Sequence, residues 1–258
     1  MPTPRTAGMR IVPLVPPGSM PGTAADVLYA LGEACTGAAA WTGVSRAMDP
    51  AVELRSFRLP GRESRLAEAP LDHVDAIVDD LVDGLLPSLA DDPRPYGLVG
   101  ACSGALGCYE LARRLGQLDV AQPRVLIAIS QQAPWIPPPA DATQSSELPI
   151  DQLLGVLERF GSPQVHPGLG RILSLLEPAM RADLRAFERY RHRDGEPLRC
   201  RVVCLYGDGD PWLHEPGIQE WARTTTGTFR AEVLPGAHQL ASSGPAQLAQ
   251  ALQRAVRP

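Results

Sequence analysis

The stretch that decides the fold is YGLVGACSGALGCYELARRL, residues 96–115. It opens with a short apolar run that ends in Gly100, as in a buried strand, and residues 103–115 carry apolar side chains at helical spacing. Between the two lies the turn G-A-C-S-G. Glycines on either side of such a turn leave no Cβ to collide with neighbouring backbone, so the middle residue is exposed. The stretch therefore predicts that Cys102 is presented at the end of a strand.

This pattern matches the G-x-S-x-G nucleophile elbow, with Gly100 and Gly104 as its glycines and Cys102 in place of the serine. The following helix would direct its N-terminus at Cys102, which favours a thiolate. Cys102 is therefore the predicted covalent catalytic residue. Two alternatives stay open: Cys102 is an inert buried thiol, or Ser103 is the nucleophile in a register shifted by one residue, with alanines at the glycine positions.

A cysteine nucleophile needs a base, and His238 stands just before the final predicted helix. In enzymes of the α/β-hydrolase type, the order along the chain is nucleophile, acid, histidine. The acid then follows the apolar run RVVCLYG, where Asp208 and Asp210 both stand. We expect Asp210, because it lies later in the loop and Pro211 stiffens its position, with Asp208 as the alternative. His214 is the rival to His238 near this site.

Stabilisation of a tetrahedral oxyanion requires two backbone N–H donors. The N–H of Ser103, which follows the nucleophile, is expected to be one of them. The second is expected from the loop after the first predicted strand, VPPGSMPG (15–22). The two prolines at the start of this loop have no N–H. Gly18 is therefore the predicted donor, with Ser19 as the alternative.

Short apolar runs alternate with amphipathic stretches along most of the chain. The runs at 125–130 and 201–207 are apolar throughout, as in a parallel sheet that is covered on both faces. The alternation predicts an α/β fold, with a mostly parallel central sheet and helices on both faces. The expected strands are 10–15, 54–59, 96–100, 125–130, 201–207 and 231–236, and the expected helices are 71–90, 103–115 and 244–257.

Residues 139–197 interrupt this alternation. They begin with the linker-like PPPADATQSSE, and two helical stretches follow, around 148–160 and 170–191, with no strand between them. We expect a helical lid inserted into an α/β-hydrolase core made of residues 1–138 and 198–258. Some of its leucines are expected to line an acyl channel: Leu154, Leu157, Leu173 and Leu176.

Composition excludes several classes of protein. The formal net charge of -5 argues against a nucleic-acid partner. All 24 basic residues are Arg, so neither a Schiff-base lysine nor a Walker-A lysine exists. The five cysteines are an odd number, which argues against a secreted disulfide framework. Cys200 and Cys204 share one face of a strand without a second pair, so no metal site is predicted.

No targeting segment or membrane span is expected. The apolar run at Ile11–Val15 is shorter than a signal peptide or a membrane helix requires, and Pro13 interrupts it. The sequence thus predicts a protein that is soluble, cytoplasmic and independent of a membrane.

Several motifs together resemble the type II thioesterases of polyketide and nonribosomal peptide synthesis, a branch of the α/β-hydrolase superfamily. They are LPGRESRLAEAP (59–70), the elbow and its helix, LIAISQQAP (126–134), LEPAMRADLRAFERYRH (176–192), YGDGDPW and LPGAH. The resemblance implies hydrolysis of acyl thioesters borne on the phosphopantetheine of acyl or peptidyl carrier proteins, which would be the partners. It implies a triad of Cys102, Asp210 and His238, and no cofactor beyond the phosphopantetheine of the substrate.

The sequence departs from this family in two places. The family elbow usually reads G-H-S-M-G, whereas Ala101, Cys102 and Ser103 stand here, and its first loop usually reads P-x-A-G-G, whereas PPGSM stands here. An acyl-cysteine is a thioester and keeps the transfer potential of the substrate. The alternative is therefore an acyltransferase or a chain-releasing, cyclising enzyme that passes the acyl group to an amine, a hydroxyl or a second carrier thiol. A third reading is an inactive relative that only binds carrier protein.

Overall fold

The computed structural model describes residues 9–15, 24–137, 145–159 and 170–257. Within these residues, seven strands form one sheet in the order β1-β3-β2-β4-β5-β6-β7. All neighbouring strands are parallel except β1, which pairs antiparallel with β3 at one edge. The strands are β1 Ile11–Leu14, β2 Asp26–Leu31, β3 Val52–Phe57, β4 Tyr96–Ala101, β5 Val125–Ile129, β6 Arg201–Gly207 and β7 Phe229–Leu234.

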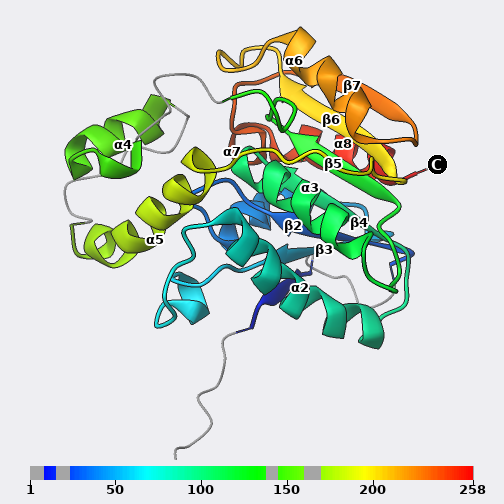
Figure 1. Cartoon of the computed structure of the whole chain (residues 1–258), viewed down its shortest axis with the longest axis horizontal. Helices are drawn as coiled ribbons and strands as arrows, with labels where there is room; N and C mark the ends of the chain where they lie inside the picture. The colour runs from blue at the N-terminus through cyan, green and yellow to red at the C-terminus, as the bar shows by residue number, and fades with distance from the viewer. Residues whose placement is uncertain (1–8, 16–23, 138–144, 160–169, 258) are drawn as a thin grey trace, which may run out of the picture.

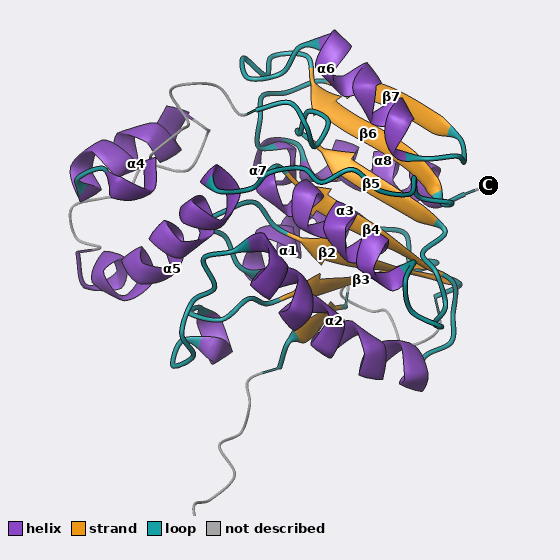
Figure 2. Ribbon diagram, viewed as in Figure 1, coloured by secondary structure: helices purple, strands orange, loops and turns teal. Residues whose placement is uncertain are grey.

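Helices cover both faces of the sheet (Figure 2). Helices α2 and α3 pack on one face, and α1 and α8 pack on the other. The helices are α1 Thr42–Ala47, α2 Val74–Asp91, α3 Ser103–Leu115, α4 Ile150–Arg159, α5 Gly170–Glu188, α6 Glu215–Gln219, α7 Leu240–Ser243 and α8 Pro245–Val256. Short 3-10 turns lie at Ala38–Trp41, Glu63–Arg65, Ser145–Glu147 and Glu220–Thr224.

The central strands are apolar because each faces two hydrophobic cores. In β4, Leu98 packs with the α2–α3 side and Val99 packs with the α1–α8 side, and both side chains are fully buried. Successive strand residues point to opposite faces of a sheet, so a strand covered on both sides needs apolar residues at every position. This confirms the predicted α/β class with a mostly parallel sheet.

The six strands and three helices predicted for the core are present, with boundary shifts of a few residues. One strand was not predicted, namely β2 at Asp26–Leu31, which pairs with β3 and β4 near the centre of the sheet. The five-residue apolar run Val27–Leu31 is buried on both faces, so it has no alternation to distinguish it from part of a buried helix. The missing strand matters, because the loop that follows it lies at the elbow.

The two helices predicted between residues 139 and 197 are also present, as α4 and α5 between β5 and β6. They lie together to one side of the sheet (Figure 1). The second half of α5 packs inward, since Ala179, Ala182 and Ala186 are buried. Among the described residues, no helix is long and apolar enough to cross a membrane.

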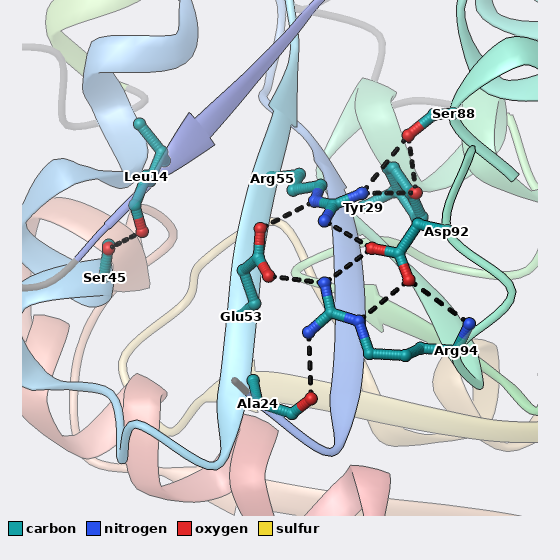
Figure 3. Close-up of polar contacts among 9 residues, drawn as sticks. All are labelled: Leu14, Ala24, Tyr29, Ser45, Glu53, Arg55, Ser88, Asp92 and Arg94. Atoms are coloured by element: carbon teal, nitrogen blue, oxygen red, sulfur yellow. Dashed lines mark hydrogen bonds and ion pairs between the residues drawn. The ribbon is translucent and has the colours of Figure 1, made fainter. Parts of the chain in front are cut away.

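A ring of charged side chains joins the amino ends of the parallel strands (Figure 3). Arg55 donates to Glu53 at 2.8 Å and to Asp92 at 2.6 Å, and Arg94 donates to Glu53 at 2.7 Å and to Asp92 at 2.8 Å. Arg94 also donates to the carbonyl oxygen of Ala24 at 2.9 Å. We call Glu53, Arg55, Asp92 and Arg94 the amino-end network. It ties the start of β3 to the segments that lead into β2 and β4.

Candidate active site

Cys102 lies between β4 and α3, on the strand–turn–helix that the sequence predicts. Its backbone has φ 48° and ψ -122°, a conformation that costs energy in residues with a side chain and that occurs at functional turns. A Cβ at Gly100 would collide with the backbone of Gly104, and one at Gly104 would collide with the carbonyl oxygen of Gly32. Both glycines are therefore required for the turn to form.

His238 and Asp210 meet at the carboxyl ends of β7 and β6. His238 Nδ1 is 2.8 Å from Asp210 Oδ2, and both side chains are buried. Asp210 Oδ1 accepts a second hydrogen bond, from the N–H of Trp212 at 3.0 Å. The alternatives lie elsewhere: Asp208 is exposed and accepts the N–H of Gly236, and His214 is exposed before α6.

The imidazole of His238 also lies close enough to Cys102 to interact with it through charge, and both residues line one cavity. Burial by itself would lower the pKa of His238. The charge of the Cys102 sulfur, together with the hydrogen bond to Asp210 and the charge of Asp210, instead raises that pKa well above its ordinary value. The structure thus brings together the three residues predicted from the sequence, and it favours a protonated His238 beside Cys102.

The other four thiols are in a different environment. Burial raises the pKa of Cys108 to about 12 and that of Cys200 to about 11. Burial also raises the pKa of Cys35 and of Cys204 well above the ordinary value. These four cysteines are therefore held as thiols, which are poor nucleophiles.

The loop that lies against the elbow follows β2. Within residues 32–36, the N–H of Ala34 donates to Ser103 Oγ at 2.7 Å, and the N–H of Cys35 donates to Asp183 at 2.8 Å. We call residues 32–36 the β2 loop. Gly18, which the sequence indicated as an oxyanion donor, lies outside the described residues. Sequence reasoning missed the β2 loop, because it did not predict the strand β2 that precedes this loop.

Glu33, in the β2 loop, is a site residue that the sequence did not reveal. It lines the same cavity as Cys102 and His238. Burial raises the pKa of Glu33 to about 7, against the opposing effects of the His238 charge and a hydrogen bond from Gln239. Glu33 is therefore a second titratable group at this site, with a pKa near neutrality.

The elbow opens into a cavity of about 680 Å³, which is large enough for an acyl chain. Its wall combines apolar and aromatic side chains from the β5–α4 segment, α3 and the end of α5. Outside the β2 loop and the residues of the elbow and of the His238 loop, the lining residues include Leu106, Pro134, Trp135, Ile136, Leu184, Phe187, Tyr190, His192 and Trp212.

Of the four predicted acyl-channel leucines, two have described side chains, and neither of these lines the cavity. Leu154 and Leu176 are partly buried but do not line the cavity, and the side chains of Leu157 and Leu173 lie outside the described set. The reason is the direction of α5. Its last turns face the elbow and line the cavity, whereas its first turns lie farther from the elbow. Leu184 and Phe187, about two to three turns after Leu176, take the place expected for it.

Comparison with known proteins identifies the family of this chain. Residues 27–256 match the family model described as a thioesterase domain. The chain belongs to the thioesterase domain family. Among its relatives, the gramicidin S biosynthesis protein GrsT of Aneurinibacillus migulanus is 30% identical over 213 residues, which cover 82% of this chain and 81% of GrsT. Thioesterase PikA5 of Streptomyces venezuelae is 31% identical over 198 residues, which cover 75% of this chain and 68% of PikA5.

A solved structure shows the same thioesterase fold. BorB, a type II thioesterase from the borrelidin biosynthetic cluster, superposes with a TM-score of 0.82 at 27% identity, and the match covers 98% of this chain and 100% of BorB. The resemblance drawn from the sequence motifs is thus confirmed at the level of the thioesterase family and of the fold.

Proposed function

We propose that this thioesterase-family protein hydrolyses acyl groups carried as phosphopantetheine thioesters on the carrier proteins of a polyketide or nonribosomal peptide pathway, through an acyl-Cys102 intermediate. The observation that carries the proposal is His238, whose imidazole is hydrogen-bonded to buried Asp210 and lines the same cavity as Cys102, close enough to interact with it through charge. The relatives named for gramicidin S and borrelidin biosynthesis support the class of pathway.

In the first step, the Cys102 thiolate attacks the carbonyl carbon of the substrate thioester, and a carbon–sulfur bond forms. The tetrahedral oxyanion collapses and expels the phosphopantetheine thiolate, which takes the proton from His238. The products are acyl-Cys102, neutral His238 and a free carrier thiol. Asp210 holds the imidazole in orientation and stabilises its protonated form.

In the second step, neutral His238 takes a proton from water as the hydroxide attacks acyl-Cys102. Collapse of the second oxyanion breaks the carbon–sulfur bond and releases a carboxylic acid. Cys102 returns as a thiolate and His238 returns protonated, so the cycle closes without a cofactor.

Both oxyanions need backbone donors, and the β2 loop offers one. Its Ala34 and Cys35 amides already donate to Ser103 and to Asp183. The N–H of Glu33 donates to no other group within the described residues. In the proposal, Glu33 N–H and Ser103 N–H hold the oxyanion, and Glu33 takes the role that the sequence gave to Gly18.

Helices α4 and α5 act as the lid in this proposal. The end of α5 already contributes Leu184 and Phe187 to the cavity wall. Those side chains, with Trp135 and Trp212, give the acyl chain an apolar surface and keep bulk water from the intermediate.

A second function, acyl transfer, is favoured by the cysteine itself. Acyl-Cys102 is a thioester, so the acyl group can still pass to an amine, a hydroxyl or another carrier thiol. The acceptor then replaces water in the second step, and the first step is unchanged.

The test is product analysis with an acyl-carrier protein, with and without added amine and thiol acceptors. The proposed hydrolase releases free acid without any acceptor, and Cys102→Ser, which forms an oxygen ester, stays a competent thioesterase. A transferase gives transferred product with the wild type and loses it in Cys102→Ser. A wild type that gives neither product would overturn both functions.

A further inference from the structure

Arg62 and Asp183 form a buried ion pair between two distant parts of the chain. Arg62 lies in the segment that follows β3, and Asp183 lies on α5. The guanidinium donates two parallel hydrogen bonds to the carboxylate, Nη1 to Oδ2 at 2.7 Å and Nη2 to Oδ1 at 2.6 Å. Only 6% of Arg62 and 2% of Asp183 is exposed, so solvent screens this pair little.

Both members of the pair also bind the main chain of the β2 loop. Asp183 Oδ2 accepts the N–H of Cys35 at 2.8 Å, and Arg62 Nη1 donates to the carbonyl oxygen of Thr36 at 2.8 Å. Cys35 has φ 68°, a left-handed conformation that a residue with a side chain rarely adopts. Such a conformation persists only where its surroundings hold it, and here the pair bonds directly at and after the strained residue.

The β2 loop is also attached to the elbow. The N–H of Ala34 donates at 2.7 Å to the Oγ of Ser103, the residue that follows Cys102. Glu33 therefore directly precedes Ala34, which is attached to the elbow, and lies two positions before Cys35, which is attached to Asp183. The direction of the Glu33 N–H depends on both attachments.

We propose that Arg62 and Asp183 are positioning residues for catalysis: they hold the β2 loop in the shape that aims its free amide at the oxyanion, and so make helix α5 a part of the catalytic machinery. The inference rests on the proposed acyl-Cys102 chemistry. A buried charge pair often adds little net stability compared with apolar residues of similar size. The bidentate geometry instead fixes the orientation of the carboxylate that receives the Cys35 amide.

The experiment compares two reactions of Cys102 in Asp183→Asn. Acylation by an acyl-carrier protein forms an oxyanion, whereas alkylation by iodoacetamide does not. We expect kcat for thioester turnover to fall roughly 10- to 100-fold with KM changed less than about threefold. The rate constant for alkylation of Cys102 should stay within about twofold of the wild type.

The double variant Arg62→Met/Asp183→Leu removes both charges together. It serves as the second test if Asp183→Asn fails to fold because Arg62 is left buried without its partner. It leaves the Cys35 amide without its acceptor, so turnover should stay slow. Glu53→Gln, in the amino-end network, is the matched control and should turn over at the wild-type rate when folded.

Three outcomes would overturn the proposal: unchanged turnover in folded Asp183→Asn, wild-type turnover in the double variant, or failure of both variants to fold, which would make the pair purely structural. A wild type that forms no acyl-Cys102 would instead contradict the proposed function, since these comparisons start from an active wild type.

Discussion

Two groups of arginines and carboxylates, one buried and one partly buried, lie at opposite ends of the strands of the same sheet. The Arg62–Asp183 pair lies at the carboxyl ends of the strands, where its hydrogen bonds reach the main chain of the β2 loop. The amino-end network (Figure 3) has the same chemistry, but its bonds join strand starts to one another. Loops at the carboxyl ends of a parallel sheet carry the site. We therefore expect the same type of ion pair to serve catalysis at the carboxyl ends of the strands and stability at their amino ends.

Among variants at the carboxyl ends of the strands, His238→Ala should cause the largest loss of activity. This variant removes the base and the positive charge beside Cys102, so acylation should slow by at least roughly 10³-fold without loss of fold. It should also change the pH dependence of alkylation. The raised pKa of His238 keeps the wild-type imidazole protonated through neutral pH, so the wild-type rate should depend less on pH than the rate of the variant.

In His238→Ala that rate should instead rise with pH, as for an ordinary thiol. Iodoacetamide kinetics on both proteins give the comparison, and circular dichroism checks the fold. An alkylation profile in the wild type that matches the variant would show that His238 does not act on Cys102.

Asp210→Asn and Asp208→Asn form a matched pair at the same edge. Asp210 holds His238 in a buried hydrogen bond, so its loss should lower kcat on the order of 10²- to 10⁴-fold. Asp208 accepts only the N–H of Gly236, and its loss should change kcat less than about threefold. Steady-state kinetics with one acyl-carrier protein decide the ranking, and the reverse order would move the acid to Asp208.

At the amino edge, Glu53→Gln should change stability and leave the chemistry intact. Loss of one partner from this network should lower the free energy of unfolding by about 3 kcal/mol, measured by denaturant unfolding. Burial opposes ionisation of Glu53, but hydrogen bonds and charge from Arg55 and Arg94 prevail and lower its pKa. A carboxyl with a lowered pKa stabilises the native state above its unfolded pKa of 4.5, and this contribution is lost as pH falls through the native pKa.

The wild type should therefore lose stability below about pH 4.5 more steeply than Glu53→Gln. Equal slopes, or a variant with reduced kcat in its folded state, would contradict the division of roles between the two edges.

The smallest expected effect is that of Glu33→Gln. Burial raises the pKa of Glu33 to about 7, so the native state binds this proton more tightly than the unfolded chain, whose reference value is 4.5. Stability should then fall as pH rises from 4.5 to about 7, by on the order of 1 kcal/mol because Glu33 is partly exposed in the cavity. Glu33→Gln should flatten this slope in denaturant unfolding, and an unchanged slope would remove Glu33 as its source.

Local pattern predicted one part of the site from the sequence. The elbow depends on Gly100 and Gly104 at fixed spacing around Cys102, and the structure has that turn. Chain order placed His238 and Asp210, because each follows a strand of a parallel sheet whose carboxyl ends meet at one edge.

Contacts between distant segments could not be predicted in the same way. Arg62 and Asp183 stand in two motifs that the sequence shows separately, but they are 121 residues apart and nothing local pairs them. Glu33 was missed because the strand before it lacks alternation. Leu176 was expected at the cavity because periodicity gives the face of a helix without its direction relative to the sheet.

The most direct test of the account is mass spectrometry of peptides after brief incubation of the protein with an acyl-carrier protein. We predict that the acyl mass is found on the peptide that contains Cys102, that Cys102→Ala carries none, and that His238→Ala gains it far more slowly than the wild type. Acylation of Ser103 or of another cysteine, or loading that persists in Cys102→Ala, would contradict the assignment of Cys102 as the covalent residue of this thioesterase-family protein.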